Sequence, residues 1–179
     1  MTPAPESIRF NVLRNALYHT ARRLRFERLT RWFNLAVILL GASAMSDAFG
    51  YFGIPAFASG AAVAVIATLQ LVFDFAGSAR DHRQLQREYY ELLADIEATV
   101  DPDAELCARW YSRMIRISGE EPPVMRAVDA KAYNDAISAL EWDDDQRLYI
   151  PLARRLLKNV LSFEGHSYRK LCELTPKAA

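Results

Sequence analysis

Residues 32–73 read WFNLAVILLGASAMSDAFGYFGIPAFASGAAVAVIATLQLVF and carry a single charged side chain, that of Asp47. Fifteen uncharged residues precede Asp47 in this stretch and 26 follow it. A bilayer core about 30 Å thick needs roughly 20 mostly apolar residues per helix. The second run is therefore long enough to span, and the first can span if Asp47 lies at the outer interface and Leu29 extends the inner end. We expect two membrane-spanning helices joined by a tight turn over residues 47–53.

Basic residues flank the apolar stretch on both sides. The 179-residue chain is neutral overall, with 22 basic and 22 acidic groups, yet residues 1–31 hold seven arginines against two acids. A second basic group follows the stretch at Arg80, His82, Arg83 and Arg87. Because positive loops stay in the cytoplasm, both termini are predicted there. Next to a membrane segment, anionic lipid is a simpler partner for the N-terminal arginines than nucleic acid.

One helix is predicted before the two spans and one after them. Residues 6–31 place apolar side chains at helical spacing, namely Phe10, Leu13, Leu17 and Leu24. The second span is expected to leave the membrane near Asp74 and to continue to about residue 99, with an apolar stripe of Leu85, Tyr89, Leu92, Ile96 and Val100. We expect the two stripes to pack antiparallel below the membrane. Pro55 suits the first turn of the second span.

The remaining chain is predicted to form further helices over about 101–117, 123–140 and 145–163, with no sheet. Asp101 and Pro102 have the residue types of an N-cap and a first helical position. Pro151 is expected to kink the last helix or delay its start. The fold class is thus all-α: a two-span transmembrane hairpin with a basic N-terminal helix and a cytosolic helical domain. The expected divisions are residues 1–31, 32–77 and 78–174, with a frayed tail over 175–179.

No catalytic signature is present in the sequence. It contains no nucleophile elbow, no dinucleotide or P-loop glycine pattern and no HExxH zinc motif. The three histidines are far apart among polar residues and are expected at the surface, and Cys107 and Cys172 are expected as free thiols. We therefore expect neither an enzyme, nor a cofactor, nor a metal site.

The second predicted span has two informative faces. One is a small-residue stripe that would let helices approach closely, formed by Ala56, Gly60, Ala64 and Thr68. It packs either on the first span of the same chain or on a neighbouring subunit. The other face would line a pore in an oligomer, with Val63 and Ile66 as an apolar gate, and comprises Ser59, Val63, Ile66, Gln70 and Asp74. Alternatively, Asp74 lies at the inner interface and pairs with Arg80 or a lipid amine.

The N-terminal helix and the helix after the spans carry a family pattern. It comprises Arg14-Asn15-Ala16-Leu17-Tyr18-His19, Ala21-Arg22-Arg23-Leu24-Arg25-Phe26, and Arg80, His82, Leu85 and Tyr89. Over roughly residues 8–100 the chain resembles the SLATT family, the two-transmembrane effector domains associated with SMODS nucleotidyltransferases and SLOG sensors. The resemblance implies a multi-pass protein of the bacterial inner membrane in an anti-phage or conflict system. It also implies a homo-oligomeric pore that responds to a nucleotide signal, and it transfers no catalytic residue.

The most probable function from sequence is a gated pore-forming effector, controlled by a nucleotide second messenger or a partner through its cytosolic helices. Six cations in that domain can meet phosphates, although solvated helix faces explain them as well: Arg109, Arg113, Arg116, Arg154, Arg155 and Lys158. One alternative is a non-conducting membrane adaptor that recruits a cytosolic protein through residues 101–174. Another is a soluble helical bundle whose apolar hairpin is only a core.

Overall fold

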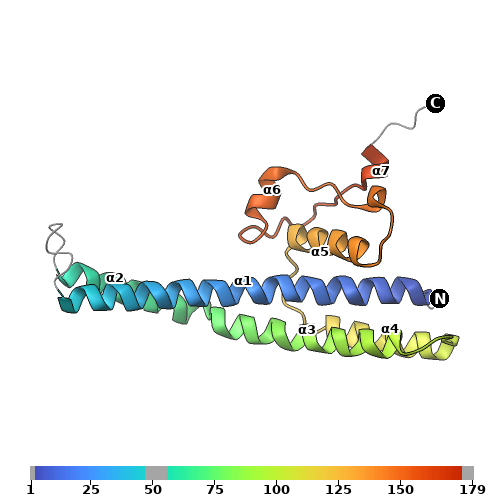
Figure 1. The fold of residues 1–179 in the computed structure, drawn as a ribbon, viewed down its shortest axis with the longest axis horizontal. Coiled ribbons are helices and arrows are strands. Elements are labelled where there is room, and N and C mark those ends of the chain that lie inside the picture. Colours follow the sequence, from blue (N-terminus) through green and yellow to red (C-terminus); the bar gives the residue numbers. More distant parts are fainter. Residues whose placement is uncertain (1–2, 47–55, 175–179) are drawn as a thin grey trace. The chain divides into compact units, whose positions relative to one another are not determined.

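A computed structural model describes residues 3–46 and 56–174 of the chain, and over these residues the protein is helical and has no strand. The all-α class is therefore confirmed. The elements are α1 (Pro5–Ser46), α2 (Ala56–Phe73), α3 (Phe75–Glu97), α4 (Ala104–Ser118), α5 (Arg126–Ala139), the 3-10 turn η2 (Asp144–Gln146), α6 (Leu152–Leu157) and α7 (Leu171–Leu174) (Figure 1). The predicted turn over 47–53, Pro55 and the predicted frayed tail over 175–179 lie outside the described residues.

The chain divides into two compact units. The first, here called the bundle unit, comprises Met1–Arg22 and His82–Ala179. The second, the two-helix unit, comprises Arg23–Asp81. Helix α1 belongs to both units and passes from one to the other without a break.

The bundle unit is built on an antiparallel pair formed by the N-terminal part of α1 and by α3. Its main core joins Ile8, Val12 and Ala16 of α1 to the predicted apolar stripe of α3, and α4 covers the pair with Cys107, Trp110 and Ile117. Four residues of that stripe are buried, namely Leu85, Tyr89, Leu92 and Ile96. Val100 was expected to continue it, but this prediction was wrong. Helix α3 ends at Glu97, and the Val100 side chain is fully exposed.

The opposite side of α1 packs on α5. Phe10 stacks on Trp142 with ring centroids 5.0 Å apart, and Leu13 and Leu17 pack in the same cluster around Ile137. These α1 residues were predicted to face the helix after the spans, so that prediction was wrong: α1 is covered on two sides and uses a different stripe for each. Leu24, also placed in that stripe, lies in the two-helix unit and is more than one-third exposed.

The chain after α3 differs most from expectation. The N-cap of α4 is Asp103 and not Asp101, because the Asp103 side chain accepts a hydrogen bond from the backbone N–H of Leu106 at 2.7 Å. The helix predicted over 145–163 does not form. Residues 147–150 form no helix, because Asn134 and the bridge to Lys170 hold the backbone of Leu148. The six-residue α6 begins only after Pro151, in agreement with the prediction that Pro151 delays the start of the helix. A single bridge pairs Leu148 with Lys170.

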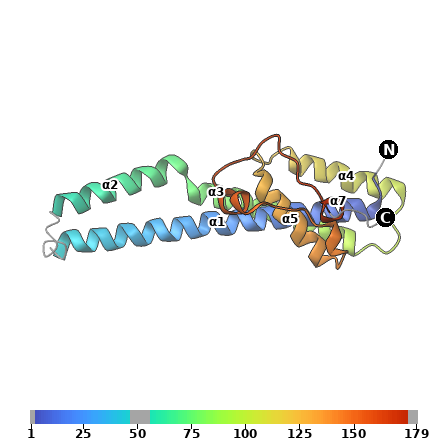
Figure 2. The same cartoon turned by 90° about the horizontal axis from the view of Figure 1, so that it is seen from above.

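The two-helix unit consists of the C-terminal part of α1, α2 and the first residues of α3. Helices α1 and α2 run alongside each other within it (Figure 2). Gln70 Nε2 of α2 donates to Asn34 Oδ1 of α1 at 2.9 Å, and the Phe33 and Phe75 rings lie 5.3 Å apart. Asp74 separates α2 from α3 with a left-handed backbone (φ 35°), which breaks the helix where the predicted span ends.

Candidate functional site

The two-helix unit exposes an apolar surface that the chain itself does not cover. Phe57 is 78% exposed and Leu71 is 82% exposed, and the other large apolar side chains more than half exposed here are Trp32, Ile38, Leu39, Val65, Val72 and Phe73. Contiguous apolar patches beyond a few hundred Å² are rare on soluble monomers and mark membrane or protein contacts. We call this set the apolar two-helix surface.

One helical stretch among the described residues is long and apolar enough to cross a membrane, namely Phe57–Glu97, which takes α2 and α3 together across the irregular residue Asp74. Almost none of its apolar window is buried inside the protein, unlike the core helix of a soluble fold. The described part of α1 does not meet the same conditions of length and composition. Membrane association is therefore supported by one helix, while the pair of spans and the cytoplasmic placement of both termini stay predictions.

The two faces of α2 differ in how far the same chain covers them. Ser59 is buried and Val63, Ile66 and Gln70 are half-buried, so four of the five residues predicted to line a pore lie on the covered side of α2. The fifth, Asp74, is exposed, and its Oδ1 accepts a hydrogen bond from the Gly77 backbone N–H at 2.9 Å.

The predicted small-residue stripe lies on the uncovered side of α2. Gly60, Ala64 and Thr68 are exposed, and a Cβ placed on Gly60 would meet no atom within 4 Å. The side chain of Ala56, the fourth member, is outside the described residues. The pore lining and the subunit contact would both require several copies of the chain, and both roles stay predictions.

A pair of buried histidines connects α1 to α3 in the bundle unit. His19 is fully buried and His82 is 3% exposed, and their Nδ1 atoms are 2.8 Å apart. A hydrogen bond between two imidazole nitrogens requires one nitrogen with a proton and one without. The pair therefore forms this hydrogen bond when one of the two Nδ1 atoms carries a proton and the other does not. We call His19 and His82 the histidine pair.

Three further side chains enclose the histidine pair. The Tyr89 ring stacks on His19 at 5.6 Å, and the Tyr89 hydroxyl donates to Glu121 Oε1. The same carboxylate oxygen is 3.3 Å from His19 Nε2, although the two atoms are not aligned for a hydrogen bond. The Tyr18 hydroxyl accepts a hydrogen bond from the Met125 backbone N–H at 3.0 Å. The cluster thus ties α1, α3 and the segment between α4 and α5 into one buried network.

Burial sets the protonation states of this network. Desolvation lowers the pKa of His82 to about 3, and electrostatic interactions with His19 and Arg22 lower it further. Burial raises the pKa of Tyr89, helped by its hydrogen bond to Glu121, and burial also raises the pKa of Tyr18. His82 and both tyrosines are therefore uncharged at neutral pH, which suits a packed core.

The prediction that the histidines lie far apart at the surface was wrong for His19 and His82, whereas His166 is exposed. A signal for burial was present in the sequence. His82 begins the alternating three- and four-residue spacing that continues through Leu85 and Tyr89, which is the spacing of a packed helix seam. No group of three or more potential ligands is placed to hold a metal ion within residues 3–46 and 56–174.

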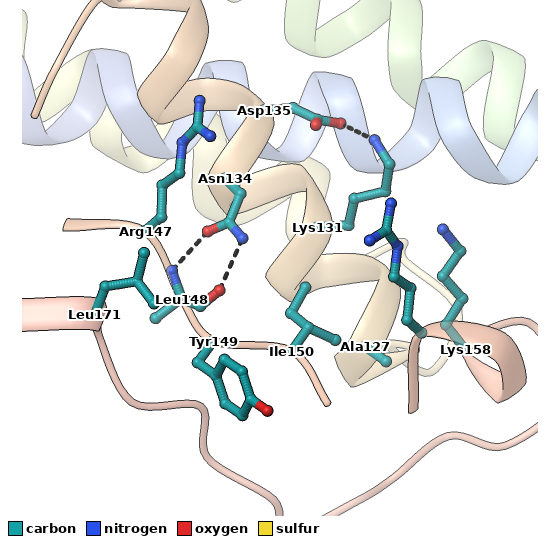
Figure 3. A pocket seen from close by; sticks show the side chains of 11 residues that line it. Ala127, Lys131, Asn134, Asp135, Arg147, Leu148, Tyr149, Ile150, Lys158 and Leu171 are labelled. Carbon is teal, nitrogen blue, oxygen red and sulfur yellow. Dashed lines mark hydrogen bonds and ion pairs between the residues drawn. The ribbon is translucent and has the colours of Figure 1, made fainter. Parts of the chain in front are cut away.

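A cavity of about 380 Å³ lies in the bundle unit among α5, residues 147–150, α6 and α7. Its wall is fixed by Asn134, whose side chain donates to the Leu148 carbonyl at 2.9 Å and accepts from the Leu148 N–H at 2.7 Å (Figure 3). The Leu171 N–H donates to the Arg147 carbonyl at 2.8 Å and holds the other side. Sequence reasoning could not find this wall, because it depends on contacts between segments far apart in the chain.

Four cations line this cavity, which we call the basic pocket: Lys131, Arg147, Arg155 and Lys158. Lys131 pairs with Asp135, and Arg147 is 3.0 Å from Asp144. Among the described residues neither Arg155 nor Lys158 forms an ion pair. Burial, together with the charges of Lys131 and Arg155, lowers the pKa of the Lys158 amine. The pocket therefore has an excess of positive charge, which an anion would neutralise.

The six cations predicted to meet phosphates do not form one site. Arg155 and Lys158 line the basic pocket, whereas the Arg154 guanidinium lies over the Tyr168 ring, 5.5 Å from its centroid. The α4 arginines line a different cavity beside Trp110. There Arg113 is already paired with Asp95 and Glu91, and Arg116 donates to Ser112.

Comparison of the chain with protein-family models, curated proteins and solved structures finds no match.

Proposed function

We propose that this chain is a pore-forming membrane effector of the kind implied by its resemblance to the SLATT family. In this proposal the two-helix unit inserts into the bacterial inner membrane, several copies surround a pore, and the bundle unit controls opening from the cytoplasm. The signal is a nucleotide or a partner protein. The observation that carries the proposal is the apolar two-helix surface.

The size of the hydrophobic effect argues that this surface is covered in the cell. Burying a Leu, Phe or Val side chain is worth roughly 1.5–3 kcal/mol relative to leaving it in water. Leu71, Phe57 and Val72 each keep at least 70% of their surface exposed, and further side chains follow along both helices. Lipid tails would cover all of them at once. Helix α2 also satisfies its backbone hydrogen bonds internally, as a lipid-exposed segment must.

Assembly of several copies is supported by the uncovered side of α2. The open space at Gly60 would let a second helix backbone approach closely, as small residues do in membrane interfaces. We propose that Gly60, Ala64 and Thr68 contact a neighbouring subunit. The half-buried Val63 and Ile66 would then form the apolar constriction after α1 and α2 rearrange, and such a constriction closes a pore by excluding water.

Gating would use the helices that belong to both units. Helix α1 is uninterrupted from Pro5 to Ser46, and α3 begins in the two-helix unit and continues into the bundle core. A ligand or partner that binds one packing of the bundle unit more tightly shifts the population toward it. Because α1 and α3 belong to both units, a change in the packing of the bundle unit would be transmitted along these helices to the two-helix unit.

The test is potassium efflux from liposomes that contain the purified protein. Ile66→Ser should produce signal-independent efflux, because a hydroxyl in the constriction would let water enter. Val65→Ser changes an apolar side chain that is adjacent in sequence to Ile66 but lies outside both predicted faces of α2, and it should leave efflux unchanged. If Ile66→Ser inserts into the liposomes but conducts no better than protein-free vesicles, the pore is contradicted. The non-conducting adaptor would then explain the apolar two-helix surface.

A further inference from the structure

Bare apolar side chains lie next to the basic pocket. Leu156 is 80% exposed, Leu152 75% and Val160 71%, although all three belong to the bundle unit, which has a buried core. Helix α6 supplies Leu152 and Leu156 one turn apart, and between them it supplies Arg155 to the pocket. The same short segment therefore combines exposed apolar groups with positive charge that has no counterion among the residues the structure describes.

Two features of the cations show that they can receive an anion. Arg155 is exposed and Lys158 half-buried, and neither is within ion-pair distance of a carboxylate among the described residues. Lys131 and Lys158 lie together at one end of the pocket, while Arg147 lies at the other (Figure 3). The single carboxylate in the lining, that of Asp135, is already bound to Lys131.

We propose that residues 149–161 form a lipid-docking surface, in which Lys131, Arg155 and Lys158 hold the phosphate of an anionic headgroup and Leu152, Leu156 and Val160 enter the headgroup–acyl boundary. This is the combination found where proteins lie on membranes: basic groups attract anionic lipid and apolar side chains bury in its interface. The surface belongs to the bundle unit and gives that unit its own contact with the bilayer.

A lipid surface would cover the exposed apolar side chains and also neutralise the cations, whereas each other occupant would do only one of these. A soluble phosphate compound would neutralise the cations but would leave Leu152, Leu156 and Val160 in water. An apolar protein surface would cover those three side chains but would leave the charges of Arg155 and Lys158 without partners. The proposal rests on the proposed function in one respect only. Anchoring of the same chain in a bilayer raises the effective concentration of lipid at this surface.

Docking can be measured on the full chain with an environment-sensitive fluorophore on Leu161→Cys in a Cys172→Ser background, where the remaining cysteine, Cys107, is buried. Liposomes of phosphatidylcholine alone are compared with liposomes that also contain phosphatidylglycerol. We expect a blue shift of emission only with the anionic lipid, and no shift for a label on Ser112→Cys of α4.

Two double variants separate the two kinds of contact. Arg155→Gln with Lys158→Gln should lower the ratio of docked to undocked protein about 30-fold, because each basic side chain near an anionic surface contributes about fivefold. Arg109→Gln with Arg116→Gln removes the same number of charges from α4 and should change nothing. Leu152→Ser with Leu156→Ser should also abolish the blue shift while leaving the pocket cations in place.

Several results would overturn the proposal. These are an equal blue shift with neutral and anionic liposomes, no shift with either, or a shift that survives in the Arg155/Lys158 double variant. ATP binding that is lost in that variant, without docking on anionic liposomes, would assign the pocket to soluble phosphates instead. A failure of the proposed function would give a different result from a failure of the docking proposal. The chain would then not float with phosphatidylcholine liposomes, yet would still float with the anionic ones through this surface.

Discussion

The bundle unit and the two-helix unit share α1, but the apolar side chains of this helix are buried in the first unit and exposed in the second. Before Arg22, α1 buries Ile8, Val12 and Ala16 almost completely against α3 and α4. After Arg23, the same helix leaves Ile38 and Leu39 at least 60% exposed. Both parts belong to one uninterrupted helix, so the difference lies in the surroundings that each part requires.

This comparison shows that burial, and not helicity, distinguishes the two units. The bundle unit has a core of contacting side chains and can be stabilised by its own packing. In the two-helix unit Gln70 donates a hydrogen bond to Asn34 across the two helices and phenylalanine rings form a cluster, but most of the large apolar side chains stay exposed. Its stability must come mainly from the medium or from other copies. The first two predictions below apply one kind of change to both units, and the later ones test each unit separately.

The largest effect is expected for cavity creation in the bundle core. Leu92 is fully buried, so Leu92→Ala should lower the free energy of unfolding by about 2–5 kcal/mol. Leu71→Ala makes the same change on the apolar two-helix surface and should leave the urea midpoint of the bundle unit unchanged. Circular dichroism of the detergent-solubilised chain in urea measures both. Equal losses in the two variants would show that the units share one core.

An introduced charge should affect the predicted second span but not an exposed position of the bundle unit. Val65→Arg places a cation in the predicted second span and should reduce membrane insertion by about 3 kcal/mol, or roughly 100-fold. Val100→Arg introduces the same side chain at a fully exposed position of the bundle unit and should have no effect. The readout is the fraction of protein that stays in membranes after a carbonate wash. Full retention of Val65→Arg would argue that α2 does not enter lipid.

The histidine pair predicts how the bundle unit responds to acid. The pKa of His82 is about 3 in the folded protein and 6.5 is the ordinary value, so between these values the unfolded chain binds more protons than the folded chain. Stability contributed by neutral His82 is present above pH 6.5 and is lost as the pH falls toward 3. The expected loss between pH 7.5 and pH 5 is on the order of 2 kcal/mol. A second proton on the pair would also remove the Nδ1–Nδ1 hydrogen bond.

The measurement is the free energy of unfolding in urea at several pH values. His82→Gln should flatten the dependence between pH 7.5 and pH 5, even if that variant is less stable at every pH. His166→Gln, at an exposed histidine, should retain the wild-type dependence. A wild-type slope in His82→Gln would assign the acid sensitivity to the carboxylates of the bundle unit.

The sequence predicted helices well where an apolar period extended over many residues. It predicted a helix over residues 6–31, helix over the α2–α3 stretch and the stripe from Leu85 to Ile96, because hydrophobic spacing is a local property. It did not predict which side of α1 would face α3. Apolar side chains occupy more than one side of that helix, and only the position of α5 decides between them.

Long-range contacts explain the other differences. Residues 147–150 are extended because Asn134 and the bridge to Lys170 satisfy the backbone of Leu148. The basic pocket depends on the same contacts, so the sequence could identify Arg155 and Lys158 as candidates but could not unite them with Lys131. The histidine pair was missed for another reason: a polar residue type was given more weight than its position on a buried seam.

The smallest effect tests whether the helix break in the two-helix unit depends on local interactions. The Asp74 carboxylate lies over the start of α3, where it accepts from the Gly77 N–H, and a Cβ on Gly77 would lie 2.0 Å from Asp74 Oδ2. Gly77→Ala must therefore displace the carboxylate and lose a capping hydrogen bond worth about 1 kcal/mol.

In an Asp74→Ala background the same change meets no carboxylate and should stabilise α3 by up to about 1 kcal/mol through helix propensity. The coupling energy of the cycle is then about 1 kcal/mol, measured by hydrogen exchange of the amides over residues 75–81. Additive effects would show that packing, and not this hydrogen bond, holds the helix break at Asp74. The two-helix unit would then depend on internal packing, as the bundle unit does, more than its exposed surface suggests.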